Sequence, residues 1–294
     1  MVCSLVIFVP GWRKEKSMTK DDAIQKIKDC LTETLSGAQI DIRLFTRNNN
    51  VKYVGVVISY KDGKFNMSPI IDITDFVDAV QQGTDEKYIS KLIIDMYERE
   101  RGTFKFEVSK QYIIDNAFPV VINHEANKEM LKDVPHSKYL DLAVIYKFNI
   151  SPSGIDGCVT ITYKMLEQYS IPEDILKVVA RKRGKHEACQ LIRMSELLGL
   201  NDEVPDIYIF RTADNIYGAR AIFNKSEVRK FGMDVYVIPS SIYEVLLIPF
   251  YLDPNGMRDV IKEVNDGGEV YPQDILSYNL YKYEYSTNNY IIVD

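Results

Sequence analysis

Two serines and a glutamate are the polar residues with the clearest catalytic potential, because they interrupt an otherwise apolar stretch. In "DVYVIPSSIYEVLLIPF", residues 234–250, Ser240 and Ser241 follow Pro239 and precede Glu244. A serine nucleophile needs an activating base and oxyanion donors. The flanking glycines of the G-x-S-x-G nucleophile elbow are missing here, whereas Pro followed by serines is typical of a turn. We interpret the stretch as a hairpin turn and keep a hydrolase using Ser240 or Ser241 with Glu244 as an alternative.

A basic cluster, "RKRGKH", is the second group that could bind a ligand. Its cations Arg181, Lys182, Arg183 and Lys185 could contact phosphate. Cations also complement the negative end of a helix dipole, and the preceding pattern predicts a helix that ends near Arg181. The chain has a net charge of −6, so its overall field does not attract nucleic acid. We therefore do not expect a nucleic-acid partner, and we keep binding through this cluster as an alternative.

Metal and cofactor sites are not expected from the residues that usually build them. The motif "HEANK" begins like a zinc-protease helix at His124, but Lys128 stands where the second histidine ligand is required. The four cysteines form no C-x-x-C pair, which favours reduced thiols in a cytoplasmic protein. The sequence also lacks the phosphate-binding G-x-x-x-x-G-K-[ST] loop. We therefore predict no metal and no cofactor.

The first third of the chain predicts one helix, a small sheet and further helices. Thr19 followed by Asp22 resembles a capping box, and apolar residues then recur at helical spacing until Gly37. The segments "AQIDIRLFT" and "VKYVGVVISY" read as two strands joined by "NNN", and "MSPIIDI" as a short third strand. Helical spacing resumes between Phe76 and Tyr97. This order is typical of an α+β unit.

The remainder of the chain predicts mainly antiparallel pairing. We expect a strand from Tyr139 to Ile150, a return strand in "CVTITYKML" and a helix that follows Pro172. The apolar run after Glu244 predicts a central strand, and "NLYKYEYSTNNYIIVD" predicts a last hairpin. No regular βαβ rhythm is visible. The predicted fold class is α+β, with mixed, mostly antiparallel sheets and flanking helices.

The polar stretch "ERERGTFKFEVS" is the best candidate for a linker between two lobes. It predicts an N-terminal α+β lobe at 18–105 and a C-terminal α+β lobe at 106–294. Residues 1–17 are expected to be an N-terminal extension or a minor strand. Whether translation starts at Met1 or at Met18 stays open. Their apolar run "LVIFVP" is too short to span a bilayer, and we expect neither a secretory signal nor a membrane partner.

Two short elements carry a resemblance to a known family. The Y-G-A element is matched by Tyr217, Gly218 and Ala219, and the P-S-S-x-x-E-V element by Pro239, Ser240, Ser241, Glu244 and Val245. With "LKDVPHSKYLDLAVIYKF" and the opening from Met18, they make most of the chain similar to an uncharacterised bacterial family. That family is known as a domain of unknown function, frequent in anaerobic Gram-positive gut bacteria. Residues 1–17 and the basic cluster depart from it.

The resemblance implies a bacterial, cytoplasmic accessory protein, carried on mobile elements, and it brings no activity or cofactor. Because turn geometry explains the proline and serines but not Glu244, we expect Ser240, Ser241 and Glu244 to contact a peptide, a protein partner or a small polar ligand. A non-catalytic interaction or accessory protein is thus the predicted function. The chain ends in a strand, "YIIVD", so pairing with a second copy is a further expectation.

Overall fold

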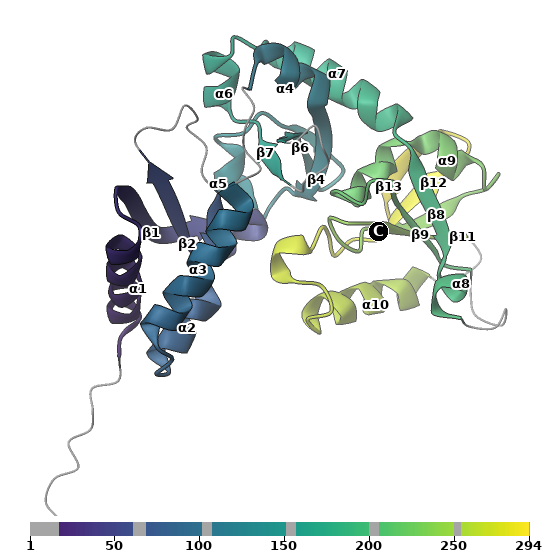
Figure 1. Ribbon diagram of the computed structural model, residues 1–294. Coiled ribbons are helices and arrows are strands. Elements are labelled where there is room, and N and C mark those ends of the chain that lie inside the picture. The colour runs from purple at the N-terminus through teal and green to yellow at the C-terminus, as the bar shows by residue number, and fades with distance from the viewer. Residues whose placement is uncertain are drawn as a thin grey trace, which may run out of the picture. The chain divides into compact units, whose positions relative to one another are not determined.

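The computed structural model describes residues 18–60, 69–101, 108–150, 157–199, 206–249 and 254–293 (Figure 1). The described part of the chain is divided into two compact units. The described residues up to 101, apart from 46–52, form the first unit, and residues 46–52 join those from 108 onward in the second. The predicted boundary at 105/106 and the predicted N-terminal extension 1–17 lie outside the described residues, so both stay predictions.

The first unit consists of a three-stranded sheet and helices that share one core with it. Its elements are α1 (Lys20–Thr34), β1 (Ala38–Thr46), β2 (Lys52–Tyr60), β3 (Ile70–Asp72), α2 (Thr74–Gln81) and α3 (Glu86–Arg101). The predicted capping box is confirmed, because the Asp22 N–H donates to Thr19 Oγ1 at 3.1 Å and the Thr19 N–H donates to Asp22 Oδ2 at 3.2 Å. Ile27, Val56 and Ile93 are buried in the shared core.

The second unit contains a four-stranded sheet around β6. Its elements up to residue 186 are the short helix η1 (Asn48–Asn50), α4 (Lys110–Asn116), β4 (Ala117–Asn123), α5 (Lys128–Leu131), β5 (Ser137–Tyr139), β6 (Leu142–Asn149), β7 (Cys158–Thr160), α6 (Tyr163–Gln168) and α7 (Glu173–His186). Strand β6 pairs with β4 on one side and with β5 and β7 on the other, always antiparallel. Helix α7 packs against β4 (Figure 1).

A six-stranded antiparallel sheet forms the rest of the second unit. Its elements are β8 (Cys189–Arg193), α8 (Met194–Leu198), β9 (Tyr208–Thr212), η2 (Gly218–Phe223), α9 (Lys225–Arg229), β10 (Val235–Ile238), β11 (Val245–Pro249), α10 (Pro254–Asp266), η3 (Pro272–Asp274), β12 (Tyr281–Glu284) and β13 (Asn289–Ile292). The strand order is β13-β12-β10-β11-β9-β8. The predicted hairpin β10–β11 and the inner position of β11 are confirmed. Because β13 is an edge strand, pairing with a second copy stays a prediction.

Both sheets of the second unit contribute to one hydrophobic core. Val121 and Tyr146 from the first sheet join Phe210, Val237 and Leu247 from the second in a single buried cluster. The predicted α+β class with mostly antiparallel sheets is therefore confirmed. Of the helices in the described ranges, none is long and apolar enough to cross a membrane.

The strand predicted from Tyr139 to Ile150 is wrong in its first part. Strand β5 ends at Tyr139, and Leu140 turns the chain with a φ of 57° before β6 begins at Leu142. The predicted return strand is also too long, since β7 ends at Thr160. Thr162 then accepts the Met165 N–H at 3.2 Å and starts α6. A local cap thus replaces the strand that the apolar alternation predicted.

The predicted helix end near Arg181 is wrong as well, because α7 continues to His186. Gly184 lies on the buried side of α7, where an added Cβ would come within 2.7 Å of Pro119 Cγ. The glycine therefore permits close packing of the helix on β4, and the basic cluster belongs to the last turns of the helix.

Candidate functional site

A cavity of about 580 Å³ in the second unit is the best candidate for a functional site, and its size is typical of small-molecule pockets. Its walls come from β4, β6, β7, η1 and the segments 215–217, 242–243 and 273–274. Its charged side chains are Arg47, Lys147 and Asp274, and its other polar side chains include Cys158, Thr160, Tyr217 and Tyr243. Ile122, Ile145 and Ile216 are among its apolar residues. We call it the Lys147 cavity.

Lys147 brings a cation into this cavity from the middle of an apolar strand. Its partner across the β6–β7 pair is Thr160, whose Oγ1 accepts a hydrogen bond from Lys147 Nζ at 2.8 Å. The ammonium also lies 4.8 Å from the centroid of the Tyr217 ring. Burial lowers the pKa of Lys147 to about 8, against an opposing effect of Cys158. Within the described residues no carboxylate forms an ion pair with this ammonium.

Replacing Lys147 with methionine is expected to raise the free energy of unfolding by about 2 kcal/mol near pH 7. The methionine has a similar length and no charge to desolvate. The folded-state pKa near 8 lies below the ordinary lysine value of about 10.4, so the unfolded chain binds more protons between these limits. Wild-type stability should therefore rise with pH in this window, and the advantage of Lys147→Met should shrink. Urea denaturation of both proteins at several pH values tests this; a constant difference would contradict it.

Tyr217 forms part of the wall next to Lys147 with a backbone conformation that non-glycine residues seldom adopt. Its φ of 49° and ψ of 47° are left-handed, which costs conformational energy and is common at functional sites. Burial raises the pKa of Tyr217 to about 12, and the nearby charges of Cys158 and Asp274 act in the same direction. The phenol therefore stays protonated and can donate a hydrogen bond to a ligand.

Gly218 lies where the Y-G-A element and the P-S-S-x-x-E-V element, which carry the family resemblance, contact each other. A Cβ on Gly218 would lie 2.2 Å from the carbonyl oxygen of Tyr243, and the Ala219 N–H donates to the Ile242 carbonyl at 3.2 Å. The Y-G-A element and the turn that follows Pro239 are thus in direct backbone contact. Together they supply Tyr217, Ile242 and Tyr243 to the wall of the Lys147 cavity.

Asp274 supplies the carboxyl group of the cavity. The residue is 6% exposed, and burial raises the pKa of its carboxyl, while the charge of Arg47 and a hydrogen bond from the Tyr243 hydroxyl lower it. The Asn48 side chain lies nearby and donates to the Gln273 carbonyl at 2.6 Å. Among the described atoms its Oδ1 is buried without a hydrogen-bond partner, so the cavity wall holds an unused acceptor.

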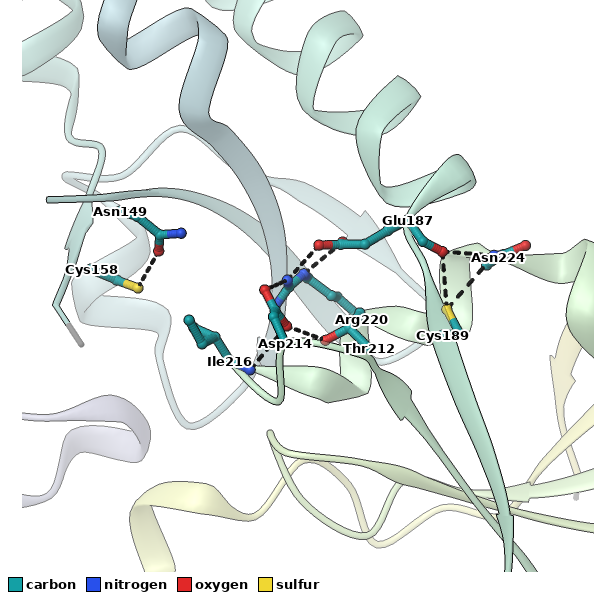
Figure 2. A network of polar contacts seen from close by, with 9 residues as sticks. All are labelled: Asn149, Cys158, Glu187, Cys189, Thr212, Asp214, Ile216, Arg220 and Asn224. Atoms are coloured by element: carbon teal, nitrogen blue, oxygen red, sulfur yellow. Dashed lines mark hydrogen bonds and ion pairs between the residues drawn. The ribbon is translucent and has the colours of Figure 1, made fainter. Parts of the chain in front are cut away.

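An ion network around the buried Arg220 fixes the segment that carries Tyr217 (Figure 2). Arg220 is 1% exposed and donates to both carboxylate oxygens of Glu187, at 2.8 and 2.6 Å, and to Asp214 Oδ2 at 2.6 Å. Asp214 Oδ1 accepts from the Thr212 hydroxyl at 2.8 Å and from the Ile216 N–H at 3.1 Å. Asp214 therefore holds the backbone that leads into Tyr217, and Arg220 holds Asp214.

The predicted contact residues Ser240, Ser241 and Glu244 lie in the turn beside this cavity. Ser241 is 4% exposed; its hydroxyl donates to Glu244 Oε1 at 3.1 Å and accepts from the Tyr243 N–H at 3.1 Å. These bonds shape the turn, and the residues of the turn that line the cavity are Ile242 and Tyr243. The role of the two serines and Glu244 in binding a partner stays a prediction.

The predicted phosphate-contact residues divide into two pairs on α7. Arg181 and Lys185 lie one turn apart and line a second cavity, which Lys182 and Arg183 do not line. Arg183 instead donates to the carbonyl oxygen of Asp115. Contact of these four residues with phosphate stays a prediction, and the geometry favours Arg181 and Lys185.

Sequence reasoning did not single out Lys147 and Asp274, which line the cavity, although one signal was present. A lysine inside the apolar strand "LAVIYKFN" is unusual, because a buried charge needs a partner or a function. Asp274 lies in a short helix with no recognisable motif. The described ranges contain no group of three or more His, Cys, Asp or Glu side chains that could hold a metal ion.

The fold and the site define a two-unit α+β protein with a ligand-sized cavity around a half-buried lysine. The chain belongs to a family of unknown function, DUF5688, which matches residues 20–285. The predicted resemblance to a domain of unknown function is thereby confirmed, whereas the bacterial source stays a prediction. No curated protein and no solved structure matches the chain.

Proposed function

We propose that this chain is a non-catalytic accessory protein that binds a small, partly apolar molecule through its carboxylate in the Lys147 cavity. The observation that supports this is an ammonium group held in a cavity without a carboxylate partner among the described residues. With a pKa of about 8, roughly nine-tenths of the Lys147 side chains are protonated at pH 7. The side chain is then a cation that an anionic group can neutralise, rather than a free amine.

Other groups of the cavity suit the rest of such a ligand. The Tyr217 hydroxyl can donate a second hydrogen bond to the carboxylate, because its raised pKa keeps it protonated. Ile122, Ile145 and Ile216 offer an apolar surface to the body of the molecule. The acidic group could belong to a free carboxylic acid or to the C-terminus of a peptide, which share the same chemistry.

As the family resemblance implied, we propose that the chain is an accessory protein of the bacterial cytoplasm. The hydrolase alternative has less support, because the Ser241 hydroxyl is buried and both bonds it makes lie within its own turn. Binding of nucleic acid through 181–186 also has less support, since Lys182 does not line the second cavity and Arg183 donates to the carbonyl oxygen of Asp115.

Calorimetric titration with octanoate and with its neutral amide tests the proposed function. We expect octanoate to bind, and the amide to bind at least about tenfold more weakly, since the amide cannot neutralise Lys147. Lys147→Met should bind octanoate more weakly than the wild type by the same factor. Lys164→Met, which removes an exposed lysine of α6, should change the octanoate affinity little. A peptide with a free or an amidated C-terminus distinguishes the two sources of the carboxylate.

Proton linkage gives the experiment a second readout. A bound carboxylate favours the charged form of Lys147, so binding at pH 8–9 should be accompanied by proton uptake. Titrations in two buffers of different ionisation enthalpy measure this uptake. Equal octanoate affinity in Lys147→Met and Lys164→Met, or uptake that persists in Lys147→Met, would contradict the proposal.

A further inference from the structure

A second cavity, of about 630 Å³, lies in the second unit and is lined by basic side chains. They come from β5, from the last turns of α7 and from the start of α9, and comprise Lys138, Arg181, Lys185, His186 and Lys225. No aspartate or glutamate of the described chain lines it. We call it the basic cavity. In a chain of net charge −6, four lysine and arginine side chains at one cavity require an explanation.

The charges of the basic cavity are not neutralised by the described residues. None of its five basic side chains forms an ion pair with a described carboxylate. Burial lowers the pKa of Lys225, and the charge of Lys185 lowers it further, which shows that the two ammonium groups repel each other. A bound anion would remove this repulsion.

Hydrogen bonds hold two of these cations at fixed positions. Lys225 Nζ donates to the Asn288 carbonyl and to Asn289 Oδ1, both at 2.9 Å. Arg181 Nη2 donates to Ser137 Oγ at 3.1 Å, which leaves most of its guanidinium donors for other acceptors. These contacts restrain the side chains before a ligand arrives and reduce the entropy that binding costs.

Tyr139 adds a neutral donor to the same wall. Its hydroxyl oxygen is buried and has no hydrogen-bond partner among the described atoms, although the residue lines the cavity. A buried polar group without a partner costs free energy. An acceptor oxygen from a ligand would satisfy this hydroxyl at the place where the cations gather.

We propose that the basic cavity binds the phosphate group of a small phosphorylated molecule, independently of the Lys147 cavity. A guanidinium fork, ammonium groups and a phenol are the donors that phosphate oxygens accept from proteins. The volume suits a molecule of limited size. A polynucleotide would instead follow exposed cations along α7, among them Lys182, which lies outside the cavity.

Titration of the full chain with pyrophosphate at about 0.15 M ionic strength, where the Debye length is about 8 Å, tests this proposal. Arg181→Gln removes an exposed cation that lines the cavity, so the variant should fold, and its affinity should fall at least about tenfold. Lys182→Gln removes the same charge from the next residue of the same helix, and should keep its affinity within about twofold. Lys147→Met should bind pyrophosphate like the wild type, because the two cavities are separate.

A single-stranded oligonucleotide of about 20 bases provides the competing arm. Tighter binding of the oligonucleotide than of pyrophosphate, weakened alike by Arg181→Gln and Lys182→Gln, would overturn the proposal in favour of a surface that binds nucleic acid. Absence of pyrophosphate binding by the wild type, or equal loss in the two glutamine variants, would also overturn it. Loss in Arg181→Gln and Tyr139→Phe, with Lys182→Gln unaffected, supports it.

Discussion

Arg220→Met is expected to lower the free energy of unfolding by about 3–5 kcal/mol. The substitution removes the partner of two carboxylates at once, and most of the cost is expected from Glu187, whose side chain is 19% exposed, rather than from Asp214, whose side chain is 40% exposed. The guanidinium also lies 4.7 Å from the centroid of the Phe118 ring, so its planar group is part of the packing. Breaking a buried pair from one side is costly because the remaining charge is left desolvated.

Two further variants show whether the buried charge is the cause. Arg220→Lys retains the charge but not the two-pronged hydrogen bond to Glu187, so an intermediate loss is expected. Lys230→Met breaks the ion pair between Lys230 Nζ and Glu227 Oε2. These atoms are also 2.6 Å apart, but the lysine side chain is 69% exposed. Exposed pairs contribute less than about 1 kcal/mol. Urea denaturation of the three variants measures the loss in the free energy of unfolding, which should be largest for Arg220→Met and smallest for Lys230→Met. Equal stability of Arg220→Met and Lys230→Met would disprove the role of the buried charge.

The same network ties stability to the proposed binding site. Asp214 accepts the Ile216 N–H and so fixes the approach to Tyr217. If Arg220 is lost, Asp214 keeps the contacts within its own turn but loses its anchor to Glu187 and α7. We therefore expect Arg220→Met to weaken octanoate binding even under conditions where the protein remains folded, since the wall of the cavity is less restrained.

Local signals were enough for much of the fold. The capping box at Thr19, the hairpin that turns at Pro239 and the α+β class each depend on residues a few positions apart, and all three are confirmed. The errors arose where two local preferences compete. In "CVTITYKML" apolar alternation favours a strand, but Thr162 caps a helix, and the helix forms.

The site itself depends on contacts that the linear sequence does not display. Lys147, Tyr217 and Asp274 are separated by more than 50 residues each. The Lys147 ammonium over the Tyr217 ring, the close approach of Gly218 to Tyr243 and the hydrogen bond from the Ile242 N–H to the Asp274 carbonyl bring their segments together. Both family elements border the cavity. The Ser241 hydroxyl forms its two hydrogen bonds within its own turn, and contact of Ser240, Ser241 and Glu244 with a partner stays a prediction.

Gly218→Ala is expected to lower the free energy of unfolding by about 3 kcal/mol and to abolish octanoate binding. The added methyl group would meet the Tyr243 carbonyl oxygen at 2.2 Å and Arg211 Cβ at 3.0 Å. A backbone oxygen cannot rotate away as a side chain can, so the turn after Pro239 must shift as a whole. That shift would move Ile242 and Tyr243, which line the Lys147 cavity.

Gly256→Ala is the matched control, because a Cβ at this exposed position of α10 meets nothing within 4 Å. Alanine in a helix is expected to stabilise it by roughly 0.5–1 kcal/mol relative to glycine. Opposite signs for the two Gly→Ala changes would show that close contact, and not loss of backbone freedom, determines the effect at Gly218. If Gly218→Ala is as stable as Gly256→Ala and binds octanoate normally, the two family elements do not form a rigid wall, and the cavity does not depend on their contact.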